Sequence, residues 1–256
     1  MSVYTTEIAS DKIPSDNVIH QRLFSAYHLA KPFLKGNLLE LGCGEGRGVE
    51  LLAPLVDSYL GIDKIRAVIQ NLEKKYPEHQ FMSGVFPPFP FEDNSFDSIV
   101  TFQVIEHVKQ DEQFVREIHR VLKPGGTALI TTPNIKMTLS RNPWHEREYT
   151  AEGLTALCKK YFDQVEMKGV AGDDKVLEYH ERNRASVQKI MRFDFLDLQY
   201  KLPARLLRIP YDILNRMNRN KLKEAKDELV KSIAIDNFSL MDQNDRNLDL
   251  FCVLTK

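Results

Sequence analysis

Four closely spaced glycines mark the part of this 256-residue chain that is best suited to binding a ligand. They stand at positions 42, 44, 46 and 48, directly after the apolar run 38–41, and apolar residues at near-helical spacing follow. A Cβ atom in such a turn would disfavour positive φ angles and keep a ligand away from the backbone. A helix that begins there would offer N–H groups to the polar end of the ligand. The pattern predicts a strand, a ligand-binding turn and a helix, with an ordinary turn as the alternative.

An acidic residue stands where a second contact to such a ligand is expected. Asp63 ends the short apolar run 59–62 and follows Gly46 by 17 positions. In doubly wound α/β folds, an acidic residue about 20 positions after the glycines accepts hydrogen bonds from ribose hydroxyls. The glycines are spaced as G-C-G-E-G rather than G-x-G-x-x-G. This spacing disfavours a dinucleotide, and with it the alternative of an NAD-dependent oxidoreductase.

Two histidines could act on a substrate beside that ligand. His107 follows the expected strand 96–102, and His145 follows the expected strand 127–132, next to the only tryptophan. A histidine side chain titrates near neutral pH. His107 is therefore the natural candidate for a general base that takes the proton from a hydroxyl group of a substrate. In the alternative interpretation, Glu106 and His107 begin a helix and pack against the glycine turn without acting in catalysis.

The order of elements explains how these residues could meet. Apolar runs bounded by glycine, proline and turn residues alternate with segments of helical spacing. The expected strands are 38–41, 59–62, 79–83, 96–102, 127–132, 162–170 and 248–254, and the expected helices are 18–34, 49–56, 66–76, 111–122 and 151–160. This alternation predicts an α/β fold with a doubly wound, mostly parallel sheet of seven strands. Ligands of such sheets bind at the carboxyl ends of the strands, where the residues above lie.

We expect one large domain with additions, divided into three parts. Residues 1–36 form an N-terminal arm and a helix that either caps the site or only packs on the core. Residues 37–172 and 246–256 form the core, and residues 173–245 form a helical insertion before the last strand.

The composition narrows the class of protein. A formal net charge of −1 argues against nucleic acid as a partner. The three cysteines are widely scattered and suggest no disulfide framework. No run approaches 18 apolar residues, and the first 16 residues contain no apolar signal segment. We therefore expect a cytoplasmic protein.

The insertion carries a concentration of positive charge. Between residues 182 and 223, eleven Lys or Arg residues stand against three Asp residues, a net charge of +8, with apolar residues between them. A basic amphipathic stretch of this kind can lie on an anionic membrane surface or bind an anionic substrate. The alternatives are a helical lid and a homodimer face, both with solvated charges.

The motifs resemble those of the class I S-adenosylmethionine-dependent methyltransferases, in particular the type-11 group. The first motif of that family reads roughly E/D-x-G-x-G-x-G and is matched by residues 40–46, and the segments 89–97, 103–108 and 121–126 are similar to further motifs of the group. The resemblance covers residues 36–170. It implies S-adenosylmethionine as the cofactor and a last strand that runs antiparallel between the fifth and sixth strands. The residues implied to bind the cofactor are Glu40, Gly42, Cys43, Gly44, Gly46, Asp63, Lys64, Val85, Phe86 and Gln103.

Two of these positions depart from the family pattern. The family usually has Asp-Ala where this chain has Val85 and Phe86, so the usual acceptor for the adenine amino group is missing. Backbone amides and packing of the Phe86 ring would hold adenine instead.

For Glu40, the resemblance implies contact with the methionine end of the cofactor or with nearby backbone amides, and a solvated carboxylate is the alternative.

The resemblance implies an enzyme that transfers a methyl group. We expect the acceptor to be a hydroxyl of a small molecule, a lipid-linked intermediate or a glycan precursor, with His107 and His145 as the candidate catalytic residues. One alternative is a non-catalytic module that has kept the cofactor fold. Another is a metal-assisted RNA 2′-O-methyltransferase, since small-RNA methyltransferases bind a divalent metal through a similar arrangement. For that metal the chain offers Glu106, His107 and His145. Gln103 replaces a further Glu ligand, and because a neutral amide is a poor substitute for it, no metal is expected.

Overall fold

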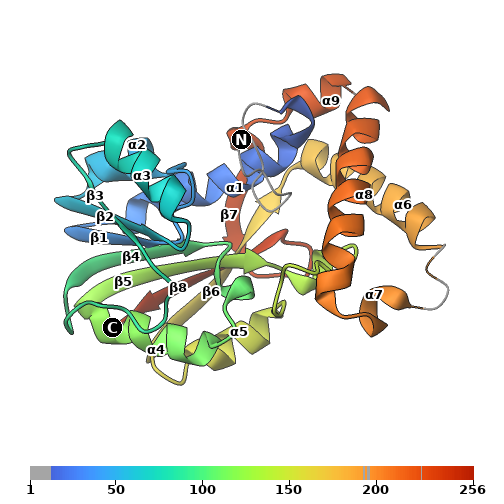
Figure 1. Cartoon of the computed structure of the whole chain (residues 1–256). Coiled ribbons are helices and arrows are strands. Elements are labelled where there is room, and N and C mark those ends of the chain that lie inside the picture. The colour runs from blue at the N-terminus through green and yellow to red at the C-terminus, as the bar shows by residue number, and fades with distance from the viewer. Residues whose placement is uncertain (1–12, 193, 195–196, 226) are drawn as a thin grey trace.

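One sheet of eight strands organises the described part of the chain, residues 13–192, 194, 197–225 and 227–256 of a computed structural model (Figure 1). The strand order is β3-β2-β1-β4-β5-β8-β6-β7, and β7 and β8 run antiparallel to the other six. The strands are β1 (Asn37–Leu41), β2 (Ser58–Asp63), β3 (Gln80–Ser83), β4 (Phe96–Phe102), β5 (Leu122–Pro133), β6 (Gln164–Gly172), β7 (Phe238–Asp242) and β8 (Asp249–Thr255).

Helices cover both faces of this sheet (Figure 1). They are α1 (Asn17–Ala30), α2 (Val49–Leu52), α3 (Arg66–Lys75), α4 (Asp111–Val121), α5 (Ala151–Cys158), α6 (Asp174–Met191), α7 (Leu198–Lys201), α8 (Ala204–Ala225) and α9 (Asp227–Ser232). Successive residues of a strand point to opposite faces. Leu38 of β1 therefore packs in the core that α1, α2 and α3 cover, and Leu39 packs in the core under α4 and α5.

The predicted fold class is confirmed, with one strand more than expected. β8 lies between β5 and β6 and is antiparallel to both, as the resemblance implied. The additional strand is β7, which pairs with β6 at the edge of the sheet. It lies at the end of the insertion for which only helices were expected. Its residues alternate between buried Phe238 and exposed Ser239, the period-2 signal of a half-buried strand.

The helix after the glycines is shorter than the apolar spacing suggested. α2 ends at Leu52 and continues as a 3-10 turn, Ala53–Leu55. Pro54 stands at the start of that turn. Proline has no N–H and its ring clashes with the preceding turn, so Pro54 disfavours a longer α-helix here.

The helices of the insertion stand beyond the end of the sheet toward which β4 and β5 point (Figure 1). Helix α8 is joined to the beginning of the described chain through Asp16, which is fully buried. The carboxylate of Asp16 lies 2.7 Å from the Arg216 guanidinium and 3.1 Å from that of Arg219. The predicted loose arm therefore ends in an ordered 3-10 turn, Pro14–Asp16, while its residues 1–12 lie outside the described residues.

None of the helices in the described ranges combines the length and the apolar character needed to cross a lipid bilayer.

Asp16→Ala should strongly destabilise the protein. It leaves two arginines facing a buried position without their carboxylate, and breaking a buried ion pair from one side costs about 3–5 kcal/mol. Arg216→Ala is the control, because Asp16 keeps Arg219, and we expect a loss of about 1 kcal/mol. Urea unfolding of both variants measures the difference. A loss for Asp16→Ala of only about 1 kcal/mol, as expected for Arg216→Ala, would show that α8 does not depend on Asp16.

Candidate functional site

A cavity of about 740 Å³ opens at the carboxyl ends of β1, β2 and β4. This volume is in the range of small-molecule and cofactor sites. Nine of the ten residues predicted to bind the cofactor line it, and so does His107. The residues in question are Gly42, Cys43, Gly44, Gly46, Asp63, Lys64, Val85, Phe86 and Gln103. Segments that are far apart in the sequence are thus brought to one edge of the sheet, as the doubly wound topology predicts.

The glycine turn has the backbone conformation for which glycine is required. Gly42 has φ +79°, and a Cβ atom there would stand 2.4 Å from the side chain of Val104. Gly44 has φ +51°, but a Cβ atom there would meet no protein atom within 4 Å. Because Gly44 lines the cavity, its missing side chain leaves space for a ligand against the backbone.

Asp63 fixes the turn from the end of β2. One of its carboxylate oxygens accepts a hydrogen bond from the Gly44 N–H at 3.0 Å, and the other accepts from the Ile65 N–H at 2.9 Å. The sequence suggested only an acceptor for ribose hydroxyls. Each carboxylate oxygen can accept more than one hydrogen bond, so the same group can hold the turn and still accept from a ligand.

Glu40 lies beneath the glycine turn and does not line the cavity. Its side chain is buried in β1 and accepts hydrogen bonds from the hydroxyls of Tyr27 and Tyr59. Burial raises the pKa of the Glu40 carboxyl, and the two tyrosine hydrogen bonds lower the pKa part of the way back. This buried position rules out the alternative of a solvated carboxylate and makes Glu40 a support for the turn.

Helix α1 forms one wall of the cavity. The sequence predicted this helix but not which of its residues line the cavity. His20, Leu23, Phe24 and Tyr27 all line it, at spacings of three and four positions that place them on one face of the helix. The helical periodicity of 18–34 was the available signal. It left a packing helix and a capping helix equally possible, because the sequence does not say which face meets the site.

Gln103 follows β4 with φ +58°, an uncommon conformation for a residue with a side chain. Its amide nitrogen donates to Thr131 at 3.3 Å and to the Asp249 carboxylate at 3.2 Å. Asp249 is itself paired with Arg22 of α1 at 2.5 Å. Gln103 therefore belongs to a network that fastens α1 to β5 and β8 at the rim of the cavity.

Of the two histidines predicted to act on a substrate, His107 is the one that lines the cavity. Its Nδ1 lies 3.0 Å from the Trp144 carbonyl oxygen, which can only accept, so Nδ1 carries the proton and the neutral ring keeps a lone pair on Nε2. Burial lowers the pKa of His107 to about 4. The ring is therefore neutral at physiological pH.

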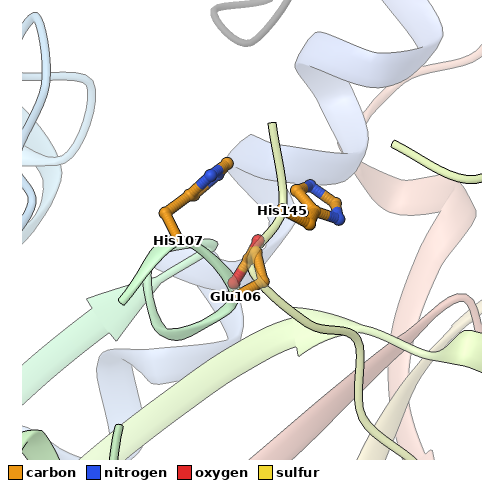
Figure 2. A group of neighbouring side chains, drawn as sticks. All are labelled: Glu106, His107 and His145. Carbon is orange, nitrogen blue, oxygen red and sulfur yellow. The ribbon is translucent and has the colours of Figure 1, made fainter. Parts of the chain in front are cut away.

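Glu106 and His145 lie next to His107 (Figure 2), but they do not line the cavity. Glu106 is buried, accepts a hydrogen bond from the Thr132 hydroxyl at 3.0 Å, and has its pKa raised to about 7 by burial. The rings of His145 and His107 meet edge to face, with centroids 4.9 Å apart.

The structure brings the three candidate metal ligands together, with one ligand atom of each within 4.8 Å of the others (Figure 2). Both ring nitrogens of His145 are engaged, however, by Asn142 at 2.8 Å and by Glu148 at 2.8 Å. A metal would have to displace one of these partners. The Gln103 amide is turned away toward Thr131 and Asp249 and adds no oxygen ligand. The donor set thus fits a divalent metal poorly.

Comparisons with known proteins indicate a methyltransferase domain. A methyltransferase domain family, the type-11 group, matches residues 39–130. A probable S-adenosylmethionine-dependent methyltransferase of Mycolicibacterium smegmatis is 40% identical over 136 residues, which are 51% of this chain and 52% of that protein. A phthiotriol/phenolphthiotriol dimycocerosates methyltransferase of Mycobacterium tuberculosis is 33% identical over 142 residues, which are 54% of this chain and 52% of that protein.

A solved structure supports the fold over almost the whole chain. It is a methyltransferase of Thermotoga maritima described as a possible histamine N-methyltransferase, with a TM-score of 0.60, 16% identity, and coverage of 93% of this chain and 91% of that one. The chain spans about half the length of the two curated relatives. The matched region contains the glycine turn, Asp63 and the segment after β4. Residues 39–130 thus match a methyltransferase domain of the type-11 family, and the relatives that resemble this region include S-adenosylmethionine-dependent methyltransferases.

Proposed function

We propose that this protein transfers the methyl group of S-adenosylmethionine to an acceptor hydroxyl on a small molecule, a lipid-linked intermediate or a glycan precursor. The observation that carries the proposal is the cavity in which the glycine turn, Asp63 and the neutral ring of His107 meet. The group that the cofactor supplies there is a methyl on a positively charged sulfur, a good leaving group. Alignment of the two reactants is then the main task of the protein.

Different residues of the cavity would align the cofactor and the acceptor. The Gly44 backbone and the Asp63 carboxylate would hold the cofactor, and Glu40 with its two tyrosines keeps the turn in place from below. Phe86 would pack on the adenine, because a carboxylate is absent from this position in the sequence.

His107 would receive the proton of an acceptor hydroxyl. Its Nδ1–H is fixed by the Trp144 carbonyl, which presents Nε2 as the basic atom. The lowered pKa keeps the ring neutral and ready to accept a proton, but it also weakens the base. We therefore assign His107 an effect at the lower end of the usual range for general bases.

The lining of the cavity suits an acceptor with apolar parts. Leu23 and Phe24 of α1, Phe86 and Phe102 all contribute to its wall. The name of the Mycobacterium tuberculosis relative points to a methyl acceptor that is a lipid. Together these observations favour an apolar or lipid-linked acceptor for this chain.

Gly44→Ala should weaken cofactor binding without unfolding the protein. The added methyl group meets no protein atom but enters the cavity, where overpacking costs about 1–3 kcal/mol of affinity. Gly125→Ala is a matched control, because Gly125 has φ +74° and equally open surroundings, yet lies outside the cavity. Both variants should lose about 1–2 kcal/mol of stability from the positive φ angle. Titration calorimetry with S-adenosylhomocysteine should separate them, and unchanged affinity in Gly44→Ala would remove the turn from the site.

Asp63→Ala should weaken binding of S-adenosylmethionine by about 1.5–3 kcal/mol, the range for hydrogen bonds to a charged group. It removes the acceptor for the ligand and releases the N–H groups of Gly44 and Ile65. Asp57→Ala, at an exposed position before β2, is the control and should bind normally. Equal affinities of the two variants in the calorimeter would show that Asp63 serves the fold alone.

His107→Ala should lower kcat about 10²-fold while leaving cofactor affinity nearly unchanged, because the interaction belongs to the transition state. Because its pKa is about 4, His107 stays neutral down to about pH 5, so its contribution to kcat should fall only as the pH approaches about 4. His145→Ala is the comparison, since His145 contacts His107, and it should change kcat less. Full turnover of His107→Ala would make the residue structural. Loss of parent activity on addition of a chelator would instead support the metal-assisted alternative.

A further inference from the structure

The outer face of α8 is apolar over three turns. Leu206, Ile209, Ile213 and Met217 follow one another at spacings of three and four positions, so they lie on one side of the helix. All four are exposed, Ile209 by 71% and Met217 by 63%. Tyr200 of the preceding helix α7 is exposed by 65%. Exposed large apolar residues gathered on one surface indicate a binding site.

The cations of the insertion are divided between the interior and this surface. Arg216 and Arg219 are turned inward to Asp16, and Arg208 lies over the Trp144 ring at 4.2 Å from its centre. The exposed charged residues described in α7, α8 and the link between them are three cations and one acid, namely Lys201, Arg205, Lys221 and Glu224. The apolar face is therefore accompanied by a net positive charge at the surface.

We propose that α7 and α8 dock on the surface of an anionic phospholipid bilayer. A helix with an exposed apolar face and flanking Lys and Arg residues lies in the interface of such a bilayer, with its apolar side among the acyl chains. Arg205 and Lys221 stand near the two ends of the face, where they would meet anionic headgroups. Tyrosine is enriched at the same depth, which suits Tyr200.

The charges favour a bilayer over a second copy of the chain. A symmetric dimer through this face would place the same patch of both copies in contact. The exposed cations of α7 and α8 would then lie close to those of the other copy, and like charges across an interface are unfavourable. An anionic surface removes this repulsion and still covers the apolar residues. The face is also the side of one helix, not a groove shaped for a peptide.

Another side of α8 contacts the loop that contains Trp144. The Trp144 indole N–H donates to Asp212 of α8 at 3.1 Å, and the Trp144 carbonyl accepts from His107 at 3.0 Å. A helix held at a membrane would therefore be two contacts away from a residue lining the cavity. The docking does not depend on methyl transfer, but it would bring the mouth of the proposed active site close to lipid acceptors.

Energy transfer from Trp144 to dansyl-labelled lipid tests the docking on the full chain, because Trp144 is the only tryptophan. The vesicles are phosphatidylcholine alone, or phosphatidylcholine with phosphatidylserine. We expect transfer with the anionic vesicles, little with the neutral ones, and a decrease at high salt. Ile209→Ser combined with Ile213→Ser should weaken the partition at least tenfold. Arg205→Ala and Lys221→Ala should each weaken it about fivefold.

Leu55→Ser combined with Met82→Ser is the matched control, since both side chains are exposed apolar residues far along the sheet from α8. This variant should bind vesicles as the parent does. The proposal is overturned if the parent shows no transfer with anionic vesicles, or if the Ile209/Ile213 variant binds as tightly as the parent. It is also overturned if the parent is a dimer in sedimentation and that variant is a monomer, because the occupant of the face is then a second copy.

Discussion

The burial of one carboxylate, that of Glu40, is the constraint on which the site depends. A charge placed in the interior without partners would cost several kcal/mol, so the fold must bring hydrogen-bond donors to it. The donors are Tyr27 from α1 and Tyr59 from β2. Because these hydroxyls come from different elements, the carboxylate fixes the position of α1 against the sheet. The wall of the cavity and the floor of the glycine turn are consequently parts of one hydrogen-bonded unit.

A second buried carboxylate also fixes α1 to the sheet. Asp249 of β8 is buried and paired with Arg22 of α1, and the Gln103 amide completes its partners. Helix α1 is thus tied at Arg22 and at Tyr27, and Leu23 and Phe24 of the cavity wall lie between these two positions. A ligand would meet a wall already in place. Such preorganisation lowers the entropy lost on binding and leaves more of the interaction free energy for affinity.

The sequence predicted those features of the site that arise from local chemistry. Gly42, Gly44 and Asp63 could be predicted from short segments of sequence. Glycine is the residue type that a positive φ angle favours, and a carboxylate directly after an apolar run indicates the end of a strand. The wall made by His20 and Phe24 could not be identified, since the face that a helix presents depends on distant partners. Strand β7 shows an intermediate case. Its alternation was visible in the sequence, but five residues after a long helical segment gave a weak signal.

The insertion shows why a count of charges does not describe a surface. Eleven cations between residues 182 and 223 suggested a basic amphipathic stretch with solvated charges, yet two of these cations are turned inward to the buried Asp16. A third cation, Arg208, packs over the ring of Trp144. With these three cations turned away, α8 presents an apolar face toward solvent. Its polar, hydrogen-bonded side faces the loop that contains Trp144, whose carbonyl accepts from His107. The separation of the two sides follows from where the buried anion and the aromatic ring lie. It gives the insertion a structural role at the cavity that is independent of whatever covers its outer face.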